Sequence, residues 1–116
     1  MAEGLKPLRG EVWYADFDPV VGHEQGGTRP GLIISHARLS ASPAELVIAL
    51  PITSIDKGMP SHVCVHPPEG GLRFTSFIKC EDIRSISKQR LGRHMGEVSD
   101  DTMERVDLIL RMVLDL

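Results

Sequence analysis

The sequence is short of several features that define whole classes of protein. Its two cysteines, Cys64 and Cys80, are too few for a disulfide framework or a four-cysteine zinc site, so we expect reduced, partly buried thiols. No stretch approaches the roughly 20 consecutive apolar residues that a membrane span requires. Residues 1–8 also lack the apolar core of a signal peptide. These absences predict a cytoplasmic protein with no membrane partner.

Neither positive nor negative charge dominates the sequence as a whole, but the charged residues are unevenly distributed along it. The net charge of −3 argues only weakly against nucleic-acid binding. Residues 99–116 account for the whole deficit, whereas residues 73–93 hold six basic side chains and only two acidic ones. This basic segment either follows a phosphate backbone or forms a solvated surface of strands and loops.

Length and composition are those of an ordinary globular protein. Of the 116 residues, 41% are hydrophobic and 25% are charged, and a chain of this size buries about two-thirds of its unfolded surface. We expect one domain over residues 1–116, in which residues 1–8 form a flexible N-terminal tail.

Short apolar runs predict strands as far as about residue 86, and a helical period follows them. The expected strands cover residues 11–17, 31–35, 45–50, 61–66 and 76–86, the last as one bent strand or two. From Ser99 onward, apolar residues recur at steps of three and four, which predicts an amphipathic helix with Asp101 and Glu104 as a capping pair. Its apolar positions are Met103, Val106, Leu110 and Val113. The predicted fold is mainly β (α+β), a small SH3-like barrel of five or six strands with a C-terminal helix.

One loop, residues 19–30, combines a permissive backbone with charged and amide side chains. Its glycines allow a positive φ or a close approach to a ligand, while Pro19 and Pro30 should mark where the flanking strands stop and start. Arg29 then stands at the end of the loop, where a rigid strand begins. A forked, permanently charged donor in that place suits a phosphate or a carboxylate.

The histidines give no pattern of metal ligands. The sequence has five, at positions 23, 36, 62, 66 and 94, and only His62 and His66 share an expected strand. Two imidazoles without a third ligand are usually structural or surface groups. We therefore expect no metal site and no cofactor.

Four motifs in order make the chain resemble the MazF/PemK family. They are Arg9-Gly10-Glu11-Val12-Trp13, Gly22-His23-Glu24-Gln25-Gly26-Gly27-Thr28-Arg29-Pro30, Pro51-Ile52-Thr53-Ser54 and Ile83-Arg84-Ser85-Ile86-Ser87-Lys88-Gln89-Arg90-Leu91. The resemblance implies a bacterial toxin of a toxin–antitoxin pair, a homodimeric SH3-like barrel that cuts single-stranded RNA without a metal. It also implies an antitoxin of the MazE type, whose acidic, disordered tail competes with RNA for the basic groove.

A metal-free ribonuclease can use the 2′-hydroxyl of RNA as its nucleophile. Such a reaction needs a base, an acid for the departing 5′-oxygen and positive charge for the transition state, and it leaves a 2′,3′-cyclic phosphate. The resemblance gives Arg29 the charge-stabilising role and Thr53 a contact to a phosphate oxygen. From residue chemistry alone, Arg29 could instead pair with Glu24, and Thr53 could be an ordinary residue at a strand end.

The resemblance also marks further candidate positions. Glu24 is a candidate catalytic residue, although Glu24 and Gln25 could equally order the loop through its backbone. The other candidate RNA-binding residues are His23, Gln25, Lys79, Glu81, Asp82 and Arg84. Two of them depart from the family, because many relatives have serine at the position of His23 and glutamine at that of Asp82. An ionised Asp82 cannot donate a hydrogen bond, so it should change which RNA is recognised.

Two other classes of function stay open on the residues alone. One is a non-catalytic toxin similar to the CcdB-like gyrase poisons, which acts by binding a protein. The other is an SH3-like interaction module. The loop with Arg29 and the motif around Thr53 favour the ribonuclease, because a gyrase poison needs neither.

Overall fold

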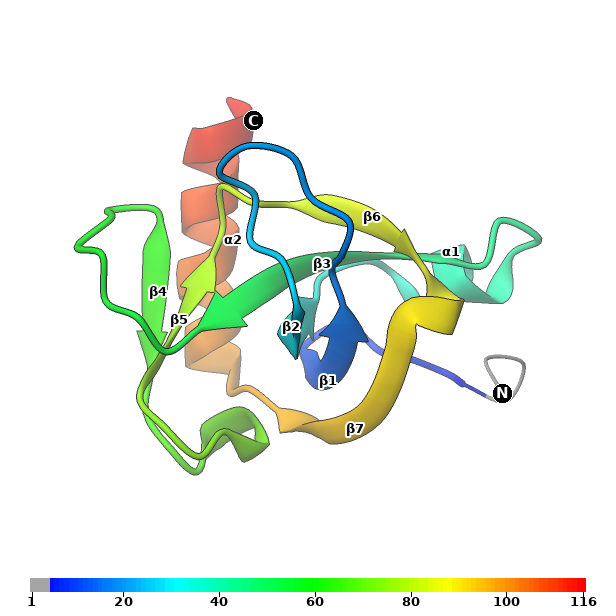
Figure 1. Cartoon of the computed structure of the whole chain (residues 1–116), viewed down its shortest axis with the longest axis horizontal. Helices are drawn as coiled ribbons and strands as arrows, with labels where there is room; N and C mark the ends of the chain where they lie inside the picture. Colours follow the sequence, from blue (N-terminus) through cyan, green and yellow to red (C-terminus); the bar gives the residue numbers. More distant parts are fainter. Residues whose placement is uncertain (1–4) are drawn as a thin grey trace.

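The computed structural model describes residues 5–116 and shows a strongly curved antiparallel sheet with one long helix against it (Figure 1). Within those residues the strands are β1 (Glu11–Asp16), β2 (Thr28–Ile33), β3 (Leu46–Thr53), β4 (His62–Val65), β5 (Ser76–Lys79), β6 (Arg84–Ser87) and β7 (Leu91–Glu97). The helices are α1 (Ala37–Ala41) and α2 (Asp100–Leu114), with the 3-10 turns η2 (Glu69–Gly71) and η3 (Lys88–Arg90). The prediction of a mainly β, barrel-like fold with a C-terminal helix is confirmed.

Strand β3 connects the two parts of the sheet. The strands lie in the order β4-β5-β3-β2-β1-β7, and β6 also pairs with β3. The first half of β3 pairs with β6, whereas its last two residues, Ile52 and Thr53, pair with Ile78 and Phe77 of β5. Thr53 therefore stands at a strand end, as its position in the sequence predicts, at the place where the sheet turns.

The sheet has seven strands, whereas the sequence predicts five or six. The segment expected at residues 76–86 forms two separate strands, and β7 has no apolar alternation to reveal it. Only Leu91 of β7 is buried, because this strand lies at the edge of the sheet and is held by pairing with β1. An edge strand is stabilised by its backbone ladder, so a period of two in hydrophobicity is not required.

The boundary expected at Pro30 is wrong. Strand β2 begins at Thr28, and Pro30 lies inside it opposite Tyr14 of β1. The pairing of β2 with β3 starts only at Gly31, so no ladder on that side needs the N–H that proline lacks. As a result, Arg29 belongs to a paired strand rather than to the end of a loop.

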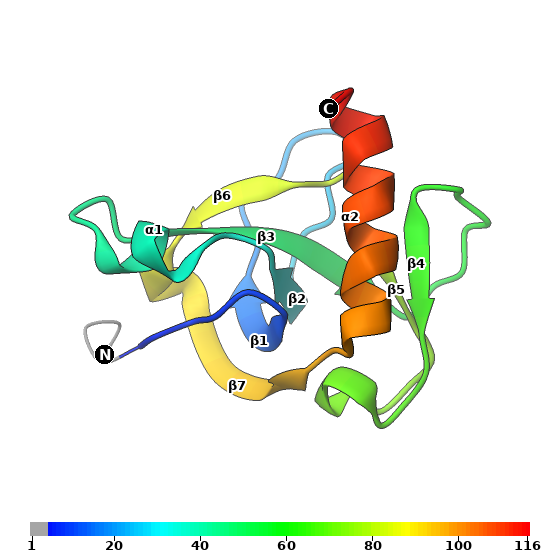
Figure 2. The same ribbon diagram turned by 180° about the vertical axis from the view of Figure 1, so that it is seen from behind.

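Two hydrophobic clusters fill the interior, one on each side of β1. Val12 belongs to a cluster with Leu50, Ile78, Val106 and others, whereas Trp13 lies in a second cluster. Helix α2 covers the first cluster beside β4 and β5 (Figure 2). Burial of a side chain such as Val106 is worth about 1.5–3 kcal/mol.

The start of α2 differs from the expected capping pair. The Ser99 side chain accepts the backbone N–H of Thr102, so Ser99 is the N-cap, and Asp100 and Asp101 occupy the first turn. There the carboxylates face the positive end of the helix dipole. Thr102, Val106 and Leu110 are buried, whereas Val113 is exposed.

The beginning of the chain is only partly described. The expected tail, residues 1–8, starts in four residues that lie outside the described range. Of the rest, Leu5 packs against the second cluster and Pro7 is fully buried. None of the helices in residues 5–116 has the length and apolar character to cross a membrane.

Candidate active site

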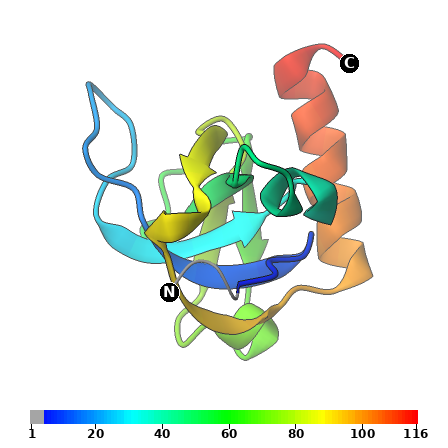
Figure 3. The same ribbon diagram turned by 90° about the vertical axis from the view of Figure 1, so that its right-hand side faces the viewer.

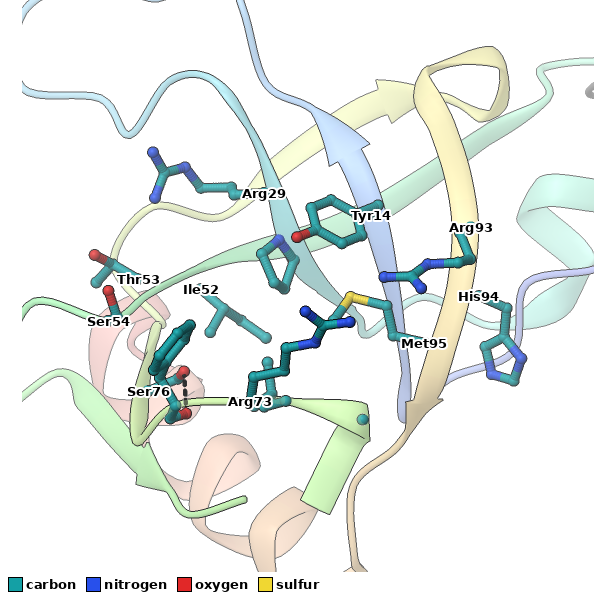
Figure 4. A pocket seen from close by; sticks show the side chains of 14 residues that line it. Tyr14, Arg29, Ile52, Thr53, Ser54, Arg73, Ser76, Arg93, His94 and Met95 are labelled. Carbon is teal, nitrogen blue, oxygen red and sulfur yellow. Dashed lines mark hydrogen bonds between the residues drawn. The ribbon is translucent and has the colours of Figure 1, made fainter. Parts of the chain in front are cut away.

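A cavity of about 470 Å³ lies between the strands β1, β2 and β7 and the segment that joins η2 to β5 (Figure 4). Three arginines line it, Arg29, Arg73 and Arg93, and none of its lining residues is an aspartate or a glutamate. The cavity therefore presents positive charge and hydrogen-bond donors without a competing carboxylate. Such a lining suits an anion with several oxygen atoms, such as a phosphodiester.

Arg29 is fixed at one atom and available at the others. Its Nε donates to the carbonyl of Gly26 at 2.6 Å. No ion pair joins its guanidinium to a carboxylate within residues 5–116, so the alternative pairing with Glu24 is not formed. The side chain comes from a paired strand and has one anchored nitrogen, which leaves the Nη groups for a ligand.

Thr53 lies at the same end of the cavity as Arg29 (Figure 4). The residue is only 3% exposed, and its Oγ1 accepts the backbone N–H of Ile55 at 3.2 Å. Because the oxygen already accepts, its own hydrogen remains to be donated. Thr53 can therefore offer a fixed hydroxyl donor to an oxygen that Arg29 also binds.

Aromatic and basic groups form the rest of the cavity wall. Arg93 on β7 lies over the ring of Tyr14 on β1, with Cζ 5.3 Å from the ring centroid. Arg73 enters from the segment before β5, and Met95 from β7 (Figure 4). Sequence reasoning missed these four as site residues, and the only signal for the two arginines is the basic excess of residues 73–93.

That basic segment divides into three groups in the structure. Arg73 and Arg93 line the cavity. Lys88 is buried and donates to the carbonyl of Ser40, and Arg90 donates to the carbonyl of Asp18. The remaining pair, Lys79 and Arg84, lies against the β1–β2 loop. The segment is thus neither a continuous phosphate track nor a simple solvated surface.

The loop that joins β1 to β2, residues 17–27, rises from the sheet on the side away from α2 (Figure 3). The structure brings Gln25 of this β1–β2 loop together with three predicted site residues, Lys79, Asp82 and Arg84. Their side chains are only 5%, 12% and 13% exposed, respectively. We call these three residues the loop clamp, because they contact the loop rather than open solvent.

Gln25 forms one hydrogen bond with each of the three loop-clamp residues. Its N–H donates to Asp82 Oδ2 at 2.7 Å, its carbonyl accepts from Arg84 Nη2 at 2.6 Å, and its Oε1 accepts from Lys79 Nζ at 3.2 Å. Asp82 also receives Arg84 Nη2 at 3.1 Å. The carboxylate thus lies between two cations and the loop backbone.

His23 and Glu24 are exposed on the β1–β2 loop and do not line the cavity. Glu24 Oε1 accepts the backbone N–H of Val21, and the Glu24 N–H donates to the Val21 carbonyl. In this arrangement the Glu24 carboxylate orders the loop, which is one of the two roles that its sequence position suggests.

Among residues 5–116, the Glu81 side chain forms its hydrogen bonds with Ser61 and His62 and not with another predicted site residue. Its carboxylate accepts the Ser61 hydroxyl at 2.8 Å and lies 2.9 Å from His62 Nε2. Burial alone would raise the pKa of Glu81, but the hydrogen bonds from His62 and Ser61 outweigh burial, and the pKa lies below its usual value. Glu81 therefore remains ionised and engaged on the β4 side of the sheet.

The cysteines and histidines have ordinary structural surroundings. Cys64 and Cys80 are both free, and burial, followed by the charge of Glu81, raises the pKa of Cys80 to about 12. His66 contacts Thr75. In the part of the chain that the structure describes, no three or more histidine, cysteine or acidic residues are grouped to hold a metal ion.

The chain is similar to known proteins over nearly its whole length. A family model described as "PemK-like, MazF-like toxin of type II toxin-antitoxin system" matches residues 8–114. Endoribonuclease EndoA of Bacillus subtilis (strain 168) is 38% identical over 109 residues, which cover 93% of this chain and 94% of that protein.

Two solved structures from Deinococcus radiodurans are also similar. A crystal structure of MazF superimposes with a TM-score of 0.86 at 29% identity, covering 97% of this chain and 99% of that chain. A crystal structure of MazE-MazF matches with a TM-score of 0.78 at 30% identity, covering 97% and 98%.

Proposed function

Because the chain belongs to the family of PemK-like and MazF-like toxins of type II toxin–antitoxin systems, we propose that this endoribonuclease cuts single-stranded RNA without a metal. The cut is sequence-specific, leaves a 2′,3′-cyclic phosphate and a 5′-hydroxyl, and stops growth by destroying messages for translation. We propose the bacterial cytoplasm as its location, because messages are translated there.

One observation carries the proposal. The guanidinium of Arg29 has a single anchored nitrogen, no carboxylate partner among the described residues, and the buried Thr53 hydroxyl at the same end of the cavity. This combination supports binding of a phosphodiester rather than a structural ion pair. A protein that merely docks on another protein has no need of it.

In the proposed reaction, the scissile phosphate is transferred from the 5′-oxygen of one nucleotide to the 2′-oxygen of the preceding one. The 2′-oxygen attacks phosphorus as its proton leaves to a base, the bond from phosphorus to the 5′-oxygen breaks, and an acid protonates that oxygen. Arg29 stabilises the charge that develops on the phosphorane oxygens, and Thr53 donates to one of them. A preorganised donor of this kind contributes about 100- to 1,000-fold in rate.

The proton carriers are proposed from the β1–β2 loop. His23 and Glu24 are exposed titratable side chains of this loop, and the general base and general acid of the reaction require pKa values near the working pH. Of the other expected RNA-binding residues, Gln25 is half-buried and the loop clamp is mostly buried. These residues are therefore proposed to act through the loop, whereas Arg73 and Arg93 contact flanking phosphates.

The proposed partners are a cognate antitoxin and a second copy of the chain. The MazE-MazF structure with the same fold supports an antitoxin, and an acidic, disordered tail would complement the arginines of the cavity. A homodimer is supported by Leu108 and Met112, which are 59% and 72% exposed on α2. The named relatives favour a ribonuclease over a gyrase poison.

The decisive experiment incubates the purified protein with a long RNA in excess EDTA and maps the ends of the fragments. Cleavage at a restricted set of sequences, with cyclic phosphate and 5′-hydroxyl ends, is the expected result. The same sequence as DNA should stay intact, because it has no 2′-hydroxyl. Cleavage of the DNA, or loss of RNA cleavage on chelation, would contradict the mechanism.

A further inference from the structure

The loop clamp holds the β1–β2 loop by atoms that the cleavage step does not use. Arg84 donates through Nη1 to the carbonyl of Phe17 at 2.8 Å and through Nη2 to the carbonyl of Gln25 at 2.6 Å. These two carbonyls lie near opposite ends of the loop. Arg84 also lies over the Phe17 ring, with Cζ 5.2 Å from the centroid. One planar guanidinium therefore ties the two arms of the loop together.

Asp82 gives this arrangement its charge balance. Its carboxylate accepts the Gln25 N–H at 2.7 Å and lies 3.1 Å from Arg84 Nη2 and 3.9 Å from Lys79 Nζ. Without that carboxylate, two mostly buried cations would face each other with no counter-charge. Removal of one member of such a group leaves an uncompensated charge, so the cluster acts as a unit.

The loop clamp reaches Arg29 through a single peptide unit. The Gln25 carbonyl is held by Arg84, and the next carbonyl, that of Gly26, accepts Nε of Arg29 at 2.6 Å. The peptide unit that joins Gly26 to Gly27 is held on its other side, because the Gly27 N–H donates to Asp18 Oδ1 at 2.9 Å. A displacement of Gln25 would therefore be passed on to the anchored nitrogen of Arg29.

We propose that Asp82 and Arg84 are positioning residues that fix the Arg29 guanidinium for cleavage through Gln25 and Gly26, without touching RNA themselves. This inference rests on the proposed ribonuclease function. In this role Asp82 does not read an RNA base, because its carboxylate oxygens already bind the loop backbone and Arg84.

Two conservative variants separate geometry from charge. Arg84→Lys keeps the positive charge but cannot bridge both carbonyls, because lysine has no planar fork. Asp82→Asn keeps the size of the side chain but removes the counter-charge. The matched control is Asp107→Asn, which breaks the ion pair of Arg9 with Asp107 on α2, far in sequence from the loop.

The measurements are single-turnover cleavage, affinity for an RNA with 2′-deoxyribose at the cut site, and hydrogen exchange of the Gln25 and Gly27 amides. We expect both variants to cleave about 10- to 100-fold more slowly, the loss typical of a misplaced catalytic group, with unchanged affinity for the uncleavable RNA. Amide exchange should accelerate at Gln25. In an Arg29→Lys background, adding Arg84→Lys should cost less than it does alone, because both changes act on one group.

The outcomes are distinguishable from failure of the proposed function. If the wild-type protein cleaves no RNA, the function is wrong, and amide exchange still tests the clamp. If the wild type cleaves and Arg84→Lys keeps its full rate and amide protection, the positioning role is wrong. A fall in affinity with an unchanged rate constant would overturn it in favour of direct RNA contact.

Discussion

The carboxylate of Glu69 accepts a hydrogen bond from Thr102 in the first turn of helix α2, although the two residues are 33 positions apart. Glu69 Oε2 accepts the Thr102 hydroxyl and also the backbone N–H of Ser99 at 2.9 Å. The contact joins the 3-10 turn η2, next to the lining of the cavity, to the helix that covers the main core. The contact therefore stabilises the folded protein and also holds in place the segment after η2 that carries Arg73.

Glu69→Gln should lower the free energy of unfolding by about 1–3 kcal/mol at neutral pH, since an amide loses the charged acceptor of several hydrogen bonds. Burial would raise the pKa of Glu69, but the bonds from Thr102 and Ser99 outweigh burial and lower it. A lowered pKa in the folded state adds stability above the unfolded pKa, which is lost as the pH falls through the folded value. Urea unfolding of both proteins between neutral and acidic pH should show their stabilities converging at low pH. A constant difference would contradict this assignment.

Arg29→Ala should reduce single-turnover RNA cleavage by at least about 100-fold, because it removes the donors for the developing phosphorane charge. Arg29→Lys should be only partly active, since lysine cannot make the forked contact. Gel filtration should show the same oligomeric state for both variants and for the wild type. Cleavage by purified Arg29→Ala at the wild-type rate would remove Arg29 from the mechanism.

Thr53→Val keeps the shape of the side chain and removes the hydroxyl, so it tests the donor alone. A hydrogen bond to a charged oxygen is worth about 1.5–3 kcal/mol, so the rate should fall by about 10- to 100-fold. Thr53→Ser, the matched control, should keep most of the activity. If valine and serine behave alike, the hydroxyl does not contact the phosphate.

Local chemistry explains why part of this site is readable from the sequence. Arg29 follows a glycine-rich loop and is indicated by residue chemistry, whereas the role of Thr53 is implied only by the family resemblance; both line the cavity in the structure. The roles of Asp82 and Arg84 depend instead on the packing of the β5–β6 turn against a loop almost 60 residues earlier. A distant pairing of this kind leaves no period in the sequence. For the same reason β7, which is held by its ladder to β1, escapes a search for apolar alternation.

Arg73→Gln and Arg93→Gln should weaken RNA binding and reduce its dependence on salt. Each phosphate contact contributes about 0.7 to the slope of log affinity against log salt for a single strand, so each variant should lose roughly that amount. Lys57→Gln offers a control, because Lys57 is exposed and does not line the cavity. Unchanged slopes in both arginine variants would show that these side chains do not bind phosphates.

The exposed side of α2 gives the last test, that of the proposed homodimer. Leu108 and Met112 are four residues apart on α2 and are 59% and 72% exposed, whereas Val106 and Leu110 on the other side fill the core. Apolar side chains grouped in this way favour contact with another protein surface.

Met112→Glu would place a charge in that contact without disturbing the core, so sedimentation should show a shift to monomer at a concentration where the wild type is dimeric. The circular dichroism spectrum and unfolding midpoint should stay close to those of the wild type, and Glu104→Gln, on an exposed polar position of the same helix, should stay dimeric. A dimeric Met112→Glu variant would mean that the two copies meet through a different surface.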